Sequence, residues 1–174
     1  MDFTTVLDNR YSVRNFSDTA IDEAAINQIL EAGRIAPTAG NRQPQRTLVI
    51  NAPEAVVLLD DCTRSRNGAP LCFAICFDME KTWKREAYDG ENSGQVDASI
   101  VTTYMMLKAT ELGLGTLWVM HFNPAKFIET YRLPENIVPV ALLMVGHPSA
   151  EAAPSLRHEE RLPLAETVCY NSFE

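Results

Sequence analysis

Residues 94–122, GQVDASIVTTYMMLKATELGLGTLWVMHF, form the stretch around which the rest of the chain is organised. Positions 94–112 predict a helix that is apolar on almost all sides, and Gly113 is the residue type that favours a helix C-terminus. Residues 115–122 then predict a strand. A helix of this composition needs cover on most sides, so we expect it at the centre of the domain or at a subunit interface.

The segments on either side alternate between helical and extended patterns. Asp22 is a suitable cap for a helix that must end before Pro37, and the polar excursion 78–93 carries Trp83 and Tyr88. The other predicted elements are a strand at 46–51, a helix at 53–62, a buried strand at 71–77, a short helix at 124–131 and a long buried strand at 137–146. From residue 149 onward the chain is rich in proline and charge and is expected to wrap something larger than its own core.

Length and composition limit the possible classes of protein. With 174 residues, 46% of them hydrophobic, residues 1–174 are expected to form a single domain. The net charge of -8 argues against a general nucleic-acid or anionic-membrane surface. The four cysteines form no CxxC pair and the three histidines are far apart, so no metal site is expected. No signal-peptide or membrane-span pattern is present, which favours a soluble, cytoplasmic protein.

One short motif stands out against this acidic background. Residues 10–16 read RYSVRNF, and in an extended chain Arg10, Ser12 and Arg14 would share one face while Tyr11 and Val13 point the other way. Such a face is suited to an anion. The alternative is a polar edge strand or a solvated turn, which a motif this short leaves open.

Side chains that would act directly on a substrate are not evident. The glycines of LGLGTLW follow a helix instead of a strand, so they do not match the dinucleotide-binding fingerprint, and no GxSxG nucleophile motif occurs. A chain that offers anion contacts and apolar surface without a reactive side chain is typical of proteins whose chemistry belongs to a cofactor.

Three separated segments together carry a family resemblance. RYSVRNF, then APTAGNRQPQ at 36–45, then VDASIVTTYMMLKATELGLGTLWVMHF followed by LPENIVPVALLMVGHP resemble the FMN-dependent nitroreductase family over roughly residues 3–165. The resemblance implies an α+β fold, a sandwich with a mainly antiparallel central sheet flanked by helices. It also implies a homodimer with two FMN sites at the interface, and an arm, about residues 149–174, exchanged onto the partner subunit.

The resemblance also implies the cofactor contacts. Arg10 and Ser12 match positions that reach the phosphate and ribityl chain, and Arg14 matches one near the flavin N1 and O2 edge or the phosphate. Residues 37–39 would lie over one face of the other subunit's flavin, and residues 41 and 43 would make polar contacts nearby. The strand end at 120–121 would present backbone N–H groups to flavin N5 and O4, and a C-terminal arginine would reach the phosphate. The residues implied at these places are Pro37, Thr38, Ala39, Asn41, Gln43, Met120, His121 and Arg161.

Two positions depart from the family pattern. Glu159 stands where many relatives have a second basic residue, so phosphate binding would lean on Arg157 or be weaker. His121 stands where glycine is common, and its side chain is either an ordinary partly exposed histidine or a substrate contact. Trp83 and Tyr88 resemble the segment that covers the family's substrate pocket, with simple loop anchors as the alternative.

The expected activity follows from this resemblance. It is an FMN-dependent oxidoreductase that uses NADH or NADPH to reduce a nitroaromatic, quinone or similar flat acceptor in two half-reactions, without a catalytic side chain. The alternatives are a specialised flavin enzyme of the same fold, such as a reductive dehalogenase-like protein, and a protein that stores or senses FMN without turnover.

Overall fold

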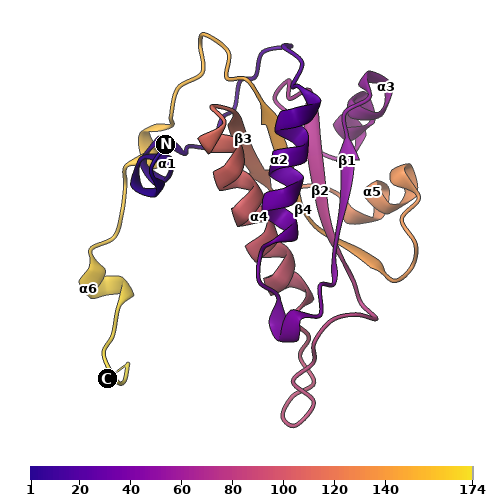
Figure 1. The fold of residues 1–174 in the computed structure, drawn as a ribbon, viewed down its shortest axis with the longest axis vertical. Coiled ribbons are helices and arrows are strands. Elements are labelled where there is room, and N and C mark those ends of the chain that lie inside the picture. The colour runs from indigo at the N-terminus through magenta and orange to yellow at the C-terminus, as the bar shows by residue number, and fades with distance from the viewer. Residues whose placement is uncertain (174) are drawn as a thin grey trace.

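A four-stranded antiparallel sheet forms the centre of the molecule. The computed structural model describes residues 1–173, and Figure 1 shows the sheet between helices. The strand order is β1-β2-β4-β3, and every neighbouring pair is antiparallel. The strands are β1 (Gln45–Ile50), β2 (Leu71–Asp78), β3 (Gly115–Val119) and β4 (Ile137–Gly146).

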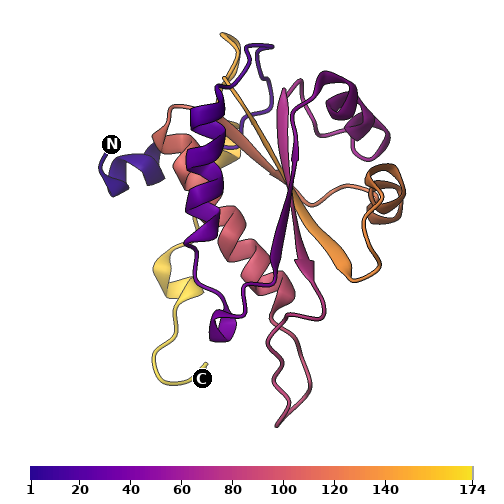
Figure 2. The ribbon, with the colours of Figure 1, turned by 45° about the vertical axis from the view of Figure 1, so that its right-hand side comes forward.

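Helices cover both faces of the sheet, as the turned view of Figure 2 shows. On one face, α2 (Glu23–Arg34) packs against α4 (Gly94–Glu111), and residues of both join a core with one side of β2 and β4. The other face is covered by α3 (Pro53–Val56), the 3-10 helix η2 (Val57–Asp61) and α5 (Pro124–Tyr131). The predicted α+β sandwich with an antiparallel sheet is therefore confirmed.

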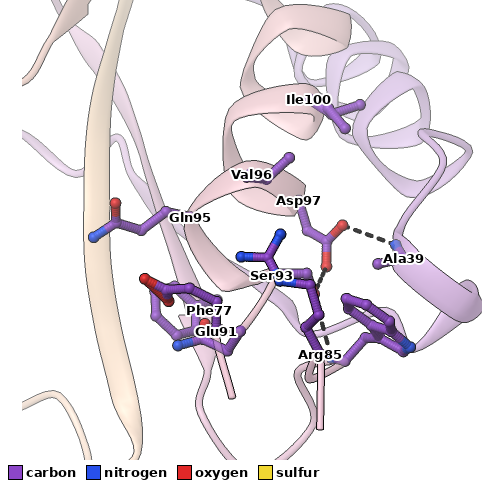
Figure 3. Close-up of a pocket in the computed structure, with 11 residues that line it drawn as sticks. Ala39, Phe77, Arg85, Glu91, Ser93, Gln95, Val96, Asp97 and Ile100 are labelled. Atoms are coloured by element: carbon purple, nitrogen blue, oxygen red, sulfur yellow. Dashed lines mark hydrogen bonds between the residues drawn. The ribbon is translucent and has the colours of Figure 1, made fainter. Parts of the chain in front are cut away.

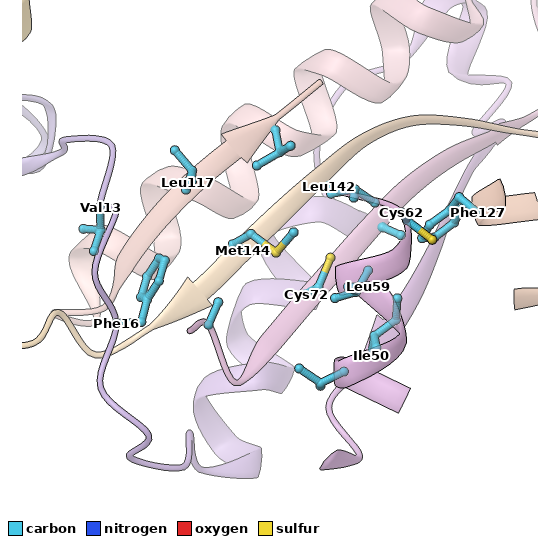
Figure 4. Close-up of a cluster of buried hydrophobic side chains, with 14 residues drawn as sticks. Val13, Phe16, Ile50, Leu59, Cys62, Cys72, Leu117, Phe127, Leu142 and Met144 are labelled. Atoms are coloured by element: carbon cyan, nitrogen blue, oxygen red, sulfur yellow. The ribbon is translucent and has the colours of Figure 1, made fainter. Parts of the chain in front are cut away.

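Strand β2 explains why the sheet needs cover on both sides. All eight of its residues are buried, and alternate side chains point to opposite faces. Phe73 and Ile75 lie in the core beneath α2 and α4, whereas Cys72 and Ala74 lie in the opposite core with Leu142 and other residues (Figure 4). A strand that is apolar on both faces is stable only between two layers.

The N-terminal segment extends the sheet at its β3 edge. Helix α1 (Phe3–Asn9) is capped by the Asp2 carboxylate, which accepts a hydrogen bond from the Thr5 N–H at 3.1 Å. The chain then becomes extended, Ser12 forms a parallel bridge with Thr116, and the Val13 N–H donates to the Thr116 carbonyl at 2.9 Å. Val13 is fully buried, which fixes the register of the whole RYSVRNF segment.

Helix α4 is covered on one side only. Ala98, Val101 and Met105 are buried against the sheet and α2, but Val96 is 62% exposed and Tyr104 is 40% exposed. Within this one chain, the expectation of burial on most sides is therefore met on the sheet side and not on the other.

Several predicted boundaries differ from the structure. The predicted 53–62 helix is divided into α3 and η2, and the predicted 115–122 strand ends at Val119. Helix α1 was not predicted at all. The boundaries of α2, α5 and β4 agree closely with the predictions, and Asp22 caps α2 as expected, accepting from the Ala25 N–H at 2.6 Å.

Residues 149–173 run along the outside of the molecule and are called the arm below (Figure 1). The arm contains only the short helices η3 (Leu156–His158) and α6 (Leu164–Thr167). Its apolar side chains are exposed, including Leu156 at 96%, Tyr170 at 84% and Phe173 at 97%. Residues 1–173 therefore leave these apolar side chains of the arm in water, which is unusual for a soluble subunit on its own.

Candidate functional site

Four arginines lie around one hollow beside the N-terminal segment, which joins the sheet at its β3 edge. The hollow has a volume of about 280 Å³, and it is lined entirely by basic and hydroxyl-bearing residues. These are Arg10, Ser12, Arg14, Ser155, Arg157, His158 and Arg161. The alternation predicted for RYSVRNF places Arg10, Ser12 and Arg14 on this side, while Val13 enters the core.

The guanidinium groups of this arginine hollow have no carboxylate partners. No ion pair within residues 1–173 involves Arg10, Arg14, Arg157 or Arg161, although other arginines of the chain pair with Asp or Glu. In a chain of net charge -8, four such groups around one cavity create a local positive potential. The arrangement suits a phosphate group, because guanidinium groups and a hydroxyl can all donate to its oxygens.

Two chain segments build the hollow. Arg10 caps the C-terminus of α1 with its backbone N–H, which donates to the Val6 carbonyl at 3.1 Å. The arm supplies the other wall, and its His158 ring contacts the Tyr11 ring edge-on, with centroids 6.2 Å apart. Of the two residues weighed for a second basic contact, Arg157 lines the hollow and Glu159 does not.

The strand end predicted to face a flavin ring lies just beyond β3. Met120 is 68% exposed, and His121 is also exposed. The His121 carbonyl accepts a hydrogen bond from the Thr63 hydroxyl at 2.7 Å, and the Asn123 N–H donates to the Cys62 carbonyl at 2.9 Å. The His121 N–H has no hydrogen-bond partner among the described residues, so it remains available as a donor.

The 37–43 loop lies elsewhere, at the N-terminal end of α4. Gly40, Asn41 and Gln43 all have positive φ, a conformation that favours glycine and tolerates asparagine. The Thr38 hydroxyl accepts from the Gln43 backbone N–H at 3.1 Å, and the Gln43 side-chain amide donates to the side-chain Oδ1 of Asn41 at 3.2 Å. These bonds hold the exposed loop in one shape.

A cavity of about 630 Å³ lies between this loop and the 78–93 excursion (Figure 3). Its apolar wall consists of Phe77, Trp83, Val96 and Ile100. The polar residues that line it are Arg85, Glu91, Asn92, Ser93, Gln95 and Asp97. The size and the mixed lining are typical of small-molecule sites. Trp83 is 40% exposed and lines the cavity, whereas Tyr88 is 87% exposed and does not line it in the single chain.

Asp97 is a residue of this cavity that the sequence did not single out. Its carboxylate is 1% exposed, accepts from the Ala39 N–H at 2.9 Å and accepts from the Ser93 hydroxyl at 2.7 Å (Figure 3). The Ser93 hydroxyl in turn accepts from the backbone N–H of Trp83 at 3.2 Å. The only signal in the sequence was an acidic residue in the first turn of an otherwise apolar helix.

Asp78 anchors the base of the excursion at the end of β2. Its carboxylate accepts from the Asn136 side chain at 2.9 Å and from the Glu80 N–H at 3.1 Å, and it pairs with Arg46 at 3.3 Å. The hydrogen bond from Asn136, together with those other contacts, lowers the pKa of Asp78 below its usual value.

The predicted site residues of the 10–14 segment and those of the 37–43 loop thus lie in two groups that residues 1–173 do not bring together. Tyr11 and Val13, from the arginine-hollow segment, line a small hollow together with Thr110 and Leu114 at the C-terminal end of α4. Ala39 and Trp83 line the cavity beside Ser93 and Asp97 at its N-terminal end. Helix α4 has 18 residues, so at 1.5 Å per residue it separates the two groups by about 27 Å.

Among residues 1–173, no helix has the length and apolar character needed to cross a membrane. The same residues contain no group of three or more His, Cys, Asp or Glu side chains that could hold a metal ion.

Comparisons with known proteins give a consistent family. The family model described as "Nitroreductase family" matches residues 7–67 and 63–147. A solved nitroreductase family protein of Clostridium difficile 630 is 41% identical, covers 99% of this chain and 100% of its own, and superposes with a TM-score of 0.92. A protein of Desulfovibrio desulfuricans, solved in complex with FMN, is 28% identical, covers 100% and 99% respectively, and has a TM-score of 0.80. An FMN reductase [NAD(P)H] of Bacillus subtilis is 27% identical over 84% of this chain, which spans 66% of that relative's length.

Proposed function

Because this chain belongs to the nitroreductase family, we propose that it is an FMN-dependent oxidoreductase that takes electrons from NADH or NADPH. The observation that carries the proposal is the arginine hollow: within residues 1–173, its four guanidinium groups have no carboxylate partners and no acidic residue lines it. The terminal phosphate of FMN is the part of the cofactor that such a site fits.

The chemistry that FMN supplies when bound is acceptance of a hydride from NAD(P)H and transfer of the electrons to a flat acceptor such as a nitroaromatic or a quinone. The protein itself has to bind the cofactor, orient it and shield it. Arg10, Ser12 and Arg161 would hold the phosphate, Arg157 would replace the basic side chain that is absent at position 159, and Arg14 would contribute positive charge; all five line the hollow. The N–H groups at Met120 and His121 would be directed to the ring edge.

A second subunit completes the site in this proposal. The 37–43 loop and the cavity beside Trp83 lie at the far end of α4 from the arginine hollow of the same chain. In a two-fold dimer, each hollow would meet the partner's loop, and the exposed side of α4 with Val96 and Tyr104 would be covered. Beyond the hollow, residues 162–173 of the arm would lie on the partner, where exposed side chains such as Tyr170 and Phe173 would be buried.

The cavity lined by Phe77, Trp83 and Ile100 is then the acceptor pocket. An apolar wall with an aromatic side chain favours flat acceptors. A pocket of this kind distinguishes a turnover enzyme from a protein that only stores FMN, which has no use for a second ligand site.

Anaerobic reduction tests the proposal. The purified protein loaded with FMN is mixed with NADH or with NADPH, and the loss of flavin absorbance is followed. Nitrobenzene or benzoquinone is then added. We expect reduction by at least one nucleotide and reoxidation by an acceptor; a bound flavin that neither nucleotide reduces would contradict the proposal.

A further inference from the structure

Asp97 carries a carboxylate that is almost completely removed from water, and no cationic side chain within residues 1–173 forms an ion pair with it. Burying a charged group without a partner of opposite charge is costly, so it persists where hydrogen bonds compensate. Both compensating bonds come from outside the regular part of α4, from the Ala39 N–H and the Ser93 hydroxyl.

Ser93 stands at the N-cap of α4, where a serine hydroxyl ordinarily accepts a hydrogen bond from the helix itself. It makes no such capping bond here. Its hydroxyl instead donates to Asp97 and accepts from the Trp83 N–H, and the Ser93 N–H donates to the Trp83 carbonyl at 2.9 Å. The helix end thus uses its polar groups to hold the excursion.

The two bonds of Asp97 connect segments that are far apart in the sequence. Ala39 belongs to the 37–43 loop, and Trp83 belongs to the 78–93 excursion. The two segments also lie close together, because a Cβ added at Gly40, which has a φ of +57°, would be in van der Waals contact with Cδ1 of Trp83 at 3.4 Å. Ala39, Trp83, Ser93 and Asp97 all line the same cavity.

We propose that Asp97 is a positioning residue that holds the 37–43 loop and Trp83 in one fixed arrangement, so that the acceptor pocket and the loop over the partner's flavin are set before the ligands bind. This inference rests on the proposed function for what the cavity binds. Its structural half, the fixing of Trp83, is independent of any ligand. Preorganisation of this kind acts on binding, because a mobile loop and ring must otherwise be ordered when the ligand arrives.

Trp83 can be observed on its own. The chain has two tryptophans, and the buried indole N–H of Trp118 has no hydrogen-bond partner within residues 1–173. Trp118 can therefore be replaced by phenylalanine without loss of a described hydrogen bond. In the Trp118→Phe background, acrylamide quenching and fluorescence anisotropy report Trp83 alone. The variants are Asp97→Ala, which removes both acceptors, and Asp97→Asn, which keeps the size and one acceptor. A third, Ser93→Ala, removes the hydroxyl that links Asp97 to the Trp83 backbone N–H and keeps the bond from the Ala39 N–H to Asp97 and the backbone bond from the Ser93 N–H to the Trp83 carbonyl.

Asp22→Ala is the matched control. The Asp22 carboxylate also accepts from a backbone N–H, at the start of α2, but it does not line the cavity. It therefore reproduces the loss of a carboxylate that stabilises a helix end without freeing either segment.

For Asp97→Ala we expect stronger quenching and lower anisotropy of Trp83, weaker FMN binding, and a KM for benzoquinone that rises about tenfold while kcat is unchanged. Ser93→Ala should alter the quenching of Trp83 and the KM for benzoquinone but leave FMN affinity as it is. Asp97→Asn should give values between those of wild type and Asp97→Ala.

A folded Asp97→Ala or Asp97→Asn protein with unchanged Trp83 quenching would overturn the inference, as would an equal change in Asp22→Ala. Failure of the proposed function would look different, because the wild-type protein itself would then show no benzoquinone-dependent oxidation of either nucleotide.

Discussion

Arg10 contributes one of the guanidinium groups of the arginine hollow, and its backbone belongs to the end of α1. If its side chain makes a charge-assisted contact to the FMN phosphate, Arg10→Ala should weaken FMN binding by about 1.5–3 kcal/mol, roughly 10- to 150-fold. The measurement is a titration of the FMN-free protein with FMN, followed by flavin fluorescence.

Arg34→Ala is the control for that experiment. Arg34 is an exposed arginine paired with Glu31 on α2, and it does not line the hollow. Its replacement should leave FMN affinity unchanged. Unaltered affinity in Arg10→Ala would mean that the hollow is only a polar edge of the sheet.

Asp78 predicts an acid-sensitive contribution to stability. Its pKa is lowered in the folded protein, mainly by the hydrogen bond from Asn136, so its contribution is present above the unfolded pKa and is lost as pH falls through the folded pKa. The difference in free energy of unfolding between wild type and Asp78→Asn should therefore shrink between about pH 7 and about pH 3. Urea titrations at both pH values measure it, and a difference that grows at low pH would contradict this account.

At the scale of single residues, the sequence predicted the side to which a side chain points better than the groups with which it forms hydrogen bonds. The period of two placed Arg10, Ser12 and Arg14 on one side because Val13 has to be buried. The role of Asp97 could not be predicted, because its partners are a backbone N–H 58 positions away and a serine at the helix start. Hydrogen bonds to backbone groups of distant segments leave no pattern in the chain.

Helix α4 approaches β2 closely through a glycine. A Cβ added at Gly94 would lie 2.3 Å from the ring of Phe77, a buried residue that lines the cavity. Gly94→Ala should therefore lower the free energy of unfolding by about 1–3 kcal/mol, because the ring has to move in a packed core. Urea unfolding measures the change.

Gln95→Ala provides the comparison on the same helix turn. Gln95 is exposed, and its replacement should change the free energy of unfolding by no more than about 0.5 kcal/mol. Equal stability of Gly94→Ala and Gln95→Ala would contradict the close packing of α4 on Phe77.

At the scale of elements, periodicity and capping predicted α2, α5 and β4 well, because each has a clear start or stop signal such as Asp22 or Pro124. The predicted 53–62 helix was wrong in its second half, where the chain tightens into η2. The strand after α4 ends at Val119 because the chain turns there to bring His121 against Thr63. Such turns depend on tertiary contacts that local propensity does not contain.

The whole molecule leaves apolar surface on α4 and on the arm exposed to solvent. If this surface forms the dimer interface, the protein should sediment as a dimer, and Tyr104→Glu should produce monomers with weakened FMN binding, because each site needs the partner's 37–43 loop. Ile128→Glu is the control, since Ile128 on α5 is 38% exposed, close to the 40% of Tyr104, but lies on the opposite layer. A Tyr104→Glu variant that remains a dimer with normal FMN affinity would place the interface elsewhere.

The most direct test of the central claim, that the arginine hollow holds the phosphate of FMN, compares FMN with riboflavin, which lacks only that phosphate. Both are titrated into the FMN-free protein under identical salt conditions, and the dissociation constants are measured by flavin fluorescence. Two charge-assisted contacts of about 1.5 kcal/mol each predict that riboflavin binds at least about 100-fold more weakly than FMN. Equal affinities for the two flavins would contradict the account.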